Sequence, residues 1–165
     1  MRKLLARIDS LSDHIGRAVA YLIPILALVE VYEVVARYVF NAPTIWACEL
    51  SSMLFGVFIL LGGAYTLHLG GHVNMDIVYN RLSVRGRAIM SICTFPLFLV
   101  FMGVLLWKGW EMAWRSLSLV EHDSTQWGPP LYPFKLMLPL GALLLLLQGV
   151  AKLARDIGTL MGDED

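Results

Sequence analysis

The sequence predicts an all-α integral membrane protein with four transmembrane helices and both termini in the cytoplasm. The chain has 165 residues, of which 58% are hydrophobic and 16% are charged, and its mean hydropathy is +0.66. This is more apolar than a soluble domain of the same size. The formal net charge is zero, so charge does not argue for a nucleic-acid partner. The cysteines at 48 and 93 form no disulfide or metal-binding pattern.

Four apolar segments are each long enough to cross about 30 Å of hydrocarbon as a helix. Pro24 falls inside the first segment, where a proline is expected to kink the helix, and Pro133 can begin the last one. We expect a single membrane domain over residues 1–165, with spans near 18–38, 47–70, 88–113 and 133–155.

Two further segments have the pattern of amphipathic helices lying at the membrane surface. In the first, near residues 3–15, Leu4, Ile8 and Leu11 recur at helical spacing among charged residues. In the second, near residues 74–87, Met75 and the apolar residues at 78 and 82 oppose an arginine-rich face. We expect both to be interfacial helices on the cytoplasmic side.

The distribution of lysine, arginine and tryptophan predicts the orientation of the chain in the membrane. With the N-terminus inside, nine Lys and Arg side chains fall on the cytoplasmic side and four on the other, which favours cytoplasmic termini. All five tryptophans then fall on the outer side, where indole rings anchor at the level of the headgroups. We expect interface anchors at Trp46, Trp107, Trp110 and Trp114.

Residues 41–43, Asn-Ala-Pro, predict a sharp turn between the first two spans. Four charged residues around this turn are the strongest functional signal. Glu30, Glu33 and Arg37 share one helical face, and Glu49 lies in the first turn of the second span. Glu33 lies four residues before Arg37, which is the favourable order for an ion pair within a helix. Ionisable groups at membrane depth must be paired or face protein. An ion or proton path is one interpretation, but such paths use broken helices and repeats around a midplane site. We therefore expect structural pairing within the chain, with a larger partner, or with a lipid headgroup at their junction.

His68, His72 and Asp76 are spaced four apart, which could indicate a metal site or a haem ligand pair. The glycines at 70–71 interrupt that helix, so a structural corner held by His72 and Asp76 is the favoured interpretation. His14 could face His68 from the same side of the membrane. A haem-bearing membrane anchor of a quinone-linked oxidoreductase is therefore retained as the alternative function.

The outer loop over residues 116–131 does not contain an active site. His122, Asp123 and Ser124 are adjacent in the chain and cannot converge on one reaction centre. No phosphate-binding loop, EF-hand or dinucleotide-binding motif is present. The sequence therefore predicts a protein that is not an enzyme and carries no cofactor. A self-sufficient small channel or exporter remains a third possibility.

Several short motifs together resemble one family. RYVFNAP at 37–43, the tryptophan at 46, Glu-Leu at 49–50 and HVNMD at 72–76 are similar to the pattern of the small membrane subunit of tripartite ATP-independent periplasmic (TRAP) transporters. The similarity extends over about residues 25–150. The outer loop, WGPPLYPFK, is richer in proline than that pattern.

The resemblance implies a bacterial inner-membrane system of three parts. A periplasmic binding protein would capture a carboxylate-bearing solute, and a large permease subunit would move it with sodium. This chain would be a scaffold that contacts no substrate and packs against the large permease and membrane phospholipid. Its outer loops over 38–46 and 114–132, including Ser124 and Trp127, would dock the binding protein.

Overall fold

The computed structural model describes residues 2–69 and 84–161, and these residues are almost entirely helical. Four stretches are long and apolar enough to span a membrane, the first of them continuing from one helix into the next. The helices are α1 (Arg2–Ala20), α2 (Leu22–Tyr38), α3 (Ala47–His68), α5 (Val84–Ser118) and α6 (Tyr132–Met161). The predicted all-helical class with four apolar spans is confirmed.

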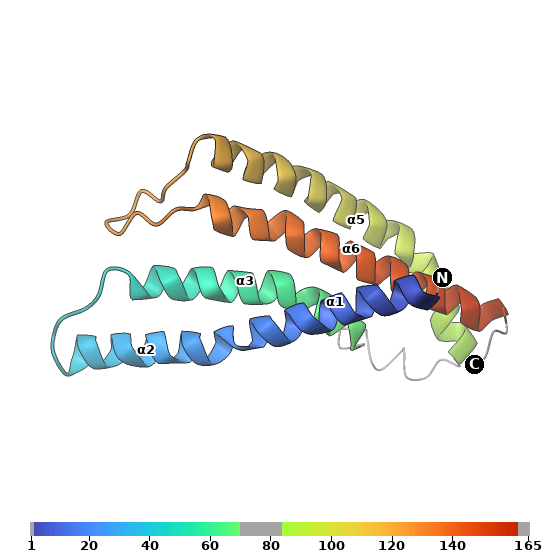
Figure 1. Cartoon of the computed structure of the whole chain (residues 1–165), viewed down its shortest axis with the longest axis horizontal. Helices are drawn as coiled ribbons and strands as arrows, with labels where there is room; N and C mark the ends of the chain where they lie inside the picture. The colour runs from blue at the N-terminus through green and yellow to red at the C-terminus, as the bar shows by residue number, and fades with distance from the viewer. Residues whose placement is uncertain (1, 70–83, 162–165) are drawn as a thin grey trace.

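The helices run along one common axis as two hairpins, α2 with α3 and α5 with α6 (Figure 1). The connections over residues 39–46 and 119–131 lie together at one end, which we call the loop end. The beginning of α1 and the end of α6 lie at the opposite end, the terminal end (Figure 1). The side of the membrane on which each end lies stays a prediction.

α1 corrects one expectation about the N-terminal segment. The predicted amphipathic helix is present, but it continues in the direction of α2 and does not turn across the bundle (Figure 1). A break at Tyr21 separates the two helices, and Pro24 lies in the first turn of α2, where it cannot donate a backbone hydrogen bond to α1. Ser12 and Val19 are buried because α1 packs against α3 and α6.

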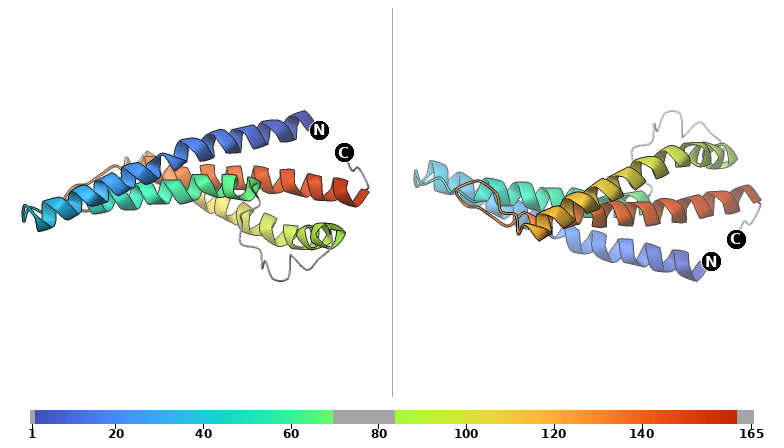
Figure 2. Two further views of the ribbon diagram at one scale, coloured as in Figure 1. Left: turned by 90° about the horizontal axis from the view of Figure 1, so that it is seen from below. Right: turned by 90° about the horizontal axis from the view of Figure 1, so that it is seen from above.

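α6 is the central helix of the bundle. It packs against α5, α3 and α1, and Figure 2 shows α1 and the beginning of α5 on opposite sides of it. Small residues make this possible, because a Cβ added at Gly141 would lie 2.5 Å from the Leu60 carbonyl oxygen of α3. A Cβ at Gly149 would lie 2.3 Å from the Phe98 ring of α5 in the same way. Backbones therefore approach closely where large side chains would keep them apart.

α5 is longer than the predicted third span. Its 35 residues rise about 52 Å at 1.5 Å per residue, well beyond a hydrocarbon core of about 30 Å. Residues 84–87 of the second predicted interfacial helix form the first turn of α5, and the rest of that segment lies outside the described residues. The structural corner assigned to His72 and Asp76 also lies outside them.

Candidate functional site

Glu33 is the centre of a polar cluster near the loop end, and its side chain is only 9% exposed. The four-residue spacing places Arg37 one turn further along α2, where its Nε donates to Glu33 Oε1 over 2.9 Å and its Nη2 forms an ion pair with the same oxygen. The second carboxylate oxygen accepts from the backbone N–H of Thr44, at 3.1 Å, and from the Thr44 hydroxyl. The charge is thus satisfied within the chain, and it fastens the loop to α2.

The loop over residues 39–46 is shaped to bring Thr44 back to α2. Asn41 adopts a positive φ of 52°, a left-handed conformation that asparagine tolerates better than most residues. Trp46 stacks on Tyr32 of α2, with ring centroids 5.8 Å apart. The predicted sharp turn is therefore present, and its tryptophan packs against the bundle.

The other two charged residues of the predicted set do not join this cluster. Glu30 is exposed and has no hydrogen-bond or ion-pair partner among the described residues. Glu49 is partly buried and accepts a hydrogen bond of 2.9 Å from the Thr125 hydroxyl, which links α3 to the outer loop. Among the described residues, the four charged side chains thus form an internal ion pair, a link between loop and helix, and one unpaired carboxylate.

A second polar cluster, which was not predicted, joins three helices towards the terminal end. Gln148 of α6 is fully buried, and its amide nitrogen lies 2.9 Å from Asp9 Oδ1 of α1 and 2.9 Å from His68 Nδ1 of α3. Its carbonyl oxygen accepts from the Ser12 hydroxyl at 3.3 Å. Arg155 forms an ion pair of 2.9 Å with Asp9 Oδ2. One amide thus connects α1, α3 and α6.

A signal for this cluster was present in the sequence. Gln148 is the one amide in the apolar run over residues 136–151, and a polar side chain inside a membrane helix usually faces other helices. Its partners could not be deduced, because Asp9 and His68 are 139 and 80 residues away in the chain.

Two of the histidines considered as haem or metal ligands, His14 and His68, lie in the described residues and have protein partners. His68 Nδ1 lies between Gln148 and Asp9, the latter at 3.1 Å. His14 Nδ1 lies 2.8 Å from the carbonyl oxygen of Ser10 on the same helix. These contacts favour structural roles for both rings. Within residues 2–69 and 84–161, no three His, Cys, Asp or Glu side chains gather as metal ligands.

Trp107, Trp110 and Trp114 lie on one exposed face of α5 in its loop-end half, with exposed fractions of 71%, 57% and 62%. Together with Glu111 and Arg115 they line a shallow hollow. Their spacing of three and four residues places them on one side of the helix. Their role as membrane-interface anchors stays a prediction.

The connection between α5 and α6 is a compact loop. His122 and Pro130 face each other in an isolated bridge, and Gly128 has the positive φ of 58° that lets the chain turn back. The Lys135 amine donates a hydrogen bond of 2.5 Å to Glu121, which holds the pKa of that carboxyl below its ordinary value. Ser124 and Trp127 remain exposed on this loop, where a partner could reach them.

Comparison with known proteins agrees with this architecture. The family model described as "Tripartite ATP-independent periplasmic transporters, DctQ component" matches residues 26–159. The chain belongs to the DctQ family. The chain is thus a small permease component of a TRAP transporter, a non-enzymatic class of membrane protein. The resemblance noted in the motifs around residues 37–50 is confirmed.

Two relatives of this DctQ-family chain come from Vibrio cholerae serotype O1. It is 25% identical over 118 residues to the C4-dicarboxylate TRAP transporter small permease protein DctQ, covering 66% of this chain and 51% of the relative. It is 26% identical over 91 residues to the sialic acid TRAP transporter small permease protein SiaQ, covering 55% and 53%. The chain thus spans about half the length of these relatives.

Proposed function

We propose that this DctQ-family chain is the non-catalytic scaffold subunit of a sodium-coupled, binding-protein-dependent importer of a carboxylate-bearing organic solute. It packs against a large permease subunit and contributes to the surface on which the periplasmic binding protein docks. It holds no substrate itself. The two relatives, named for C4-dicarboxylate and for sialic acid, support a solute that carries a carboxylate.

The observation that carries the proposal is the outward face of α2. Ile23 and Val34 are 51% and 52% exposed, and Glu30 shares their helical face without a partner in the described part of the chain. A lone carboxylate within an apolar helix face is stabilised when a neighbouring helix supplies a donor or a cation. Glu33, one turn away, is by contrast satisfied inside the chain. We therefore assign the outward face of α2 to the large permease, with a basic or hydroxyl side chain of the permease meeting Glu30.

The loop end is the proposed docking surface for the binding protein. The two connections that carry Ser124, Trp127 and residues 39–46 lie there together (Figure 1). The distribution of lysine and arginine favours this end in the periplasm and both termini in the cytoplasm of a bacterial inner-membrane protein. Thr125 and Glu49 fasten the two sides of this surface to each other, which would keep it rigid for docking.

Transport by the reconstituted proteins tests the scaffold role. We expect liposomes holding this chain alone to accumulate no organic acid under a sodium gradient. Liposomes that also hold the large permease, supplied with the binding protein, should accumulate it. Accumulation by the chain alone would overturn the proposal.

Co-purification tests the assignment of the interface. Glu30→Gln should reduce the amount of permease recovered with the chain, because the substitution removes the charge and keeps the size of the side chain. Arg37→Ala should also weaken recovery, since it leaves Glu33 without its cation. Glu111→Gln is the matched control, because Glu111 is 62% exposed and pairs with Lys108 on the surface of α5. Full recovery with Glu30→Gln and Arg37→Ala would remove α2 from the interface.

Cysteine labelling tests the orientation. In a chain whose native Cys48 and Cys93 are replaced by serine, Ser124→Cys should react with a membrane-impermeant maleimide added from the periplasm. Thr159→Cys, near the end of α6, should react only after the inner membrane is opened. The reverse pattern would invert the proposed topology.

A further inference from the structure

A groove between α3 and α5 lies in the terminal half of the bundle and is distinct from the clusters described above. α6 packs against both helices, whereas α3 and α5 do not pack closely against each other over the described residues. The groove has a volume of about 390 Å³. Gly149 of α6 lies in its floor, and the absence of a side chain there leaves room for the Phe98 ring.

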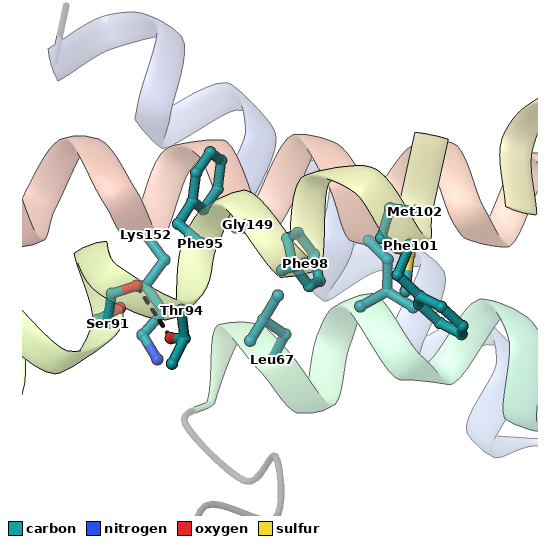
Figure 3. Close-up of a pocket in the computed structure, with 10 residues that line it drawn as sticks. Leu67, Ser91, Thr94, Phe95, Phe98, Phe101, Met102, Gly149 and Lys152 are labelled. Atoms are coloured by element: carbon teal, nitrogen blue, oxygen red, sulfur yellow. Dashed lines mark hydrogen bonds between the residues drawn. The ribbon is translucent and has the colours of Figure 1, made fainter. Parts of the chain in front are cut away.

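The groove has one polar end and one apolar end (Figure 3). Ser91, Thr94 and Lys152 lie at the polar end. The rest of the lining is apolar and includes Phe98 and Phe101. This is the polarity of an amphiphile, with a headgroup at one end and a chain along the remainder.

The polar end can bind an anion. The Lys152 amine forms no ion pair with any carboxylate of the described residues, and Asp156, one turn further along α6, does not pair with it. The Ser91 hydroxyl has no hydrogen-bond partner in the described part of the chain and is free to donate. The Thr94 hydroxyl already donates to backbone carbonyls of α5. The Lys152 amine and the Ser91 hydroxyl are therefore the two groups available to donate hydrogen bonds to an anion.

The length of the groove matches one membrane leaflet. From Ser91 to Phe101 along α5, the helix rises about 15 Å, which is half of a hydrocarbon core of about 30 Å. A helix of that length and about 10 Å in diameter would occupy roughly 1,200 Å³. The groove is about a third of that volume, so it suits a narrower chain than a helix of the permease.

We infer that this groove binds one acyl chain of an anionic phospholipid, with its headgroup phosphate on Lys152 and Ser91. A lysine near the membrane surface contributes about 1 kcal/mol toward an anionic lipid, which corresponds to about fivefold in affinity. The site lies away from the outward face of α2, so the inference does not depend on the proposed contact with the permease.

Lipid titration of the purified full-length chain in mild detergent, followed by native mass spectrometry, tests the inference. The probes are phosphatidylglycerol and phosphatidylcholine with identical acyl chains. We expect phosphatidylglycerol to bind about fivefold more tightly, and Lys152→Gln to remove that preference. Lys108→Gln is the matched control, because Lys108 lies on α5 towards the loop end and is 66% exposed.

Thr94→Trp is a second variant that tests the apolar part of the site. Thr94 is exposed along the groove, so an indole there should obstruct the acyl chain and weaken the binding of both lipids. Equal affinity for the two lipids would overturn the inference. So would a preference that Lys152→Gln leaves intact, or a preference that Lys108→Gln abolishes to the same degree.

Discussion

Replacing Gln148 by leucine should destabilise the bundle, because this one side chain links three helices. The side chain is fully buried and makes hydrogen-bonding contacts with α1 and α3 from its place on α6. Leucine fits a similar space but can neither donate nor accept. The Ser12 hydroxyl would then lose its partner, and Asp9 and His68 would each lose one contact. Asp9 would keep its ion pair with Arg155, and His68 Nδ1 would keep its contact with Asp9.

The size of the effect follows from those hydrogen bonds. Side-chain hydrogen bonds between membrane helices average about 0.6 kcal/mol and reach about 1.7 kcal/mol. Leaving a buried polar partner unsatisfied costs about 1–3 kcal/mol. Because leucine makes none of these bonds, while Asp9 stays paired through its second oxygen, we expect Gln148→Leu to lower the free energy of unfolding by about 2–3 kcal/mol. For a chain of this size, that corresponds to a decrease in melting temperature of about 5–10 °C.

Thermal unfolding of the purified chain in detergent, followed by tryptophan fluorescence and by helical circular dichroism, measures this difference. Gln126→Leu is the matched control, because Gln126 is exposed in the outer loop and should change the melting temperature little. Ser12→Ala should destabilise the wild-type chain but have little further effect in Gln148→Leu, since the two side chains share one bond. A Gln148→Leu chain as stable as the wild type would refute the reasoning.

Three further outcomes are expected. Gly141→Ala should destabilise the chain by about 1–3 kcal/mol, because the new methyl group would lie 2.5 Å from the Leu60 carbonyl oxygen. Gly62→Ala is the control and should not destabilise it, because a Cβ there has nothing within 4 Å. Equal effects of the two substitutions would contradict the close approach of α6 to α3. Because hydrogen bonding to Lys135 lowers the pKa of Glu121 below 4.5, the stabilisation from this pair is present above that pH and is lost as the pH falls through the folded-state pKa. Lys135→Gln should therefore flatten the acid side of the stability profile, and an unchanged profile would argue against the pair. Thr44→Val removes the hydroxyl that donates to Glu33 and accepts from the Ala47 N–H, and should speed hydrogen–deuterium exchange of residues 39–46 at least about fivefold, the effect of losing about 1 kcal/mol. Unchanged exchange would show that the bond from the Thr44 backbone N–H to Glu33 holds the loop without the hydroxyl.

The sequence predicted features that depend on neighbouring residues. Apolar runs of helical length identified all four membrane-spanning stretches, because the thickness of the bilayer sets the minimum length of each run. The four-residue spacing of Glu33 and Arg37 predicted their ion pair. The residues around 41–43 predicted the turn at the loop end. The family could also be identified, since its motifs are short and keep their order along the chain.

Only the tertiary structure decided how distant residues meet. The apolar face of α1 was compatible with a lipid surface or with other helices, and the burial of Ser12 and Val19 shows that it packs against the bundle. Thr44 donates to a carboxylate in the preceding helix. Gln148, near the end of the chain, contacts Asp9 near its beginning and His68 in the first half. Periodicity reports which face of a helix is apolar but not what covers it, so these pairings follow from packing in three dimensions.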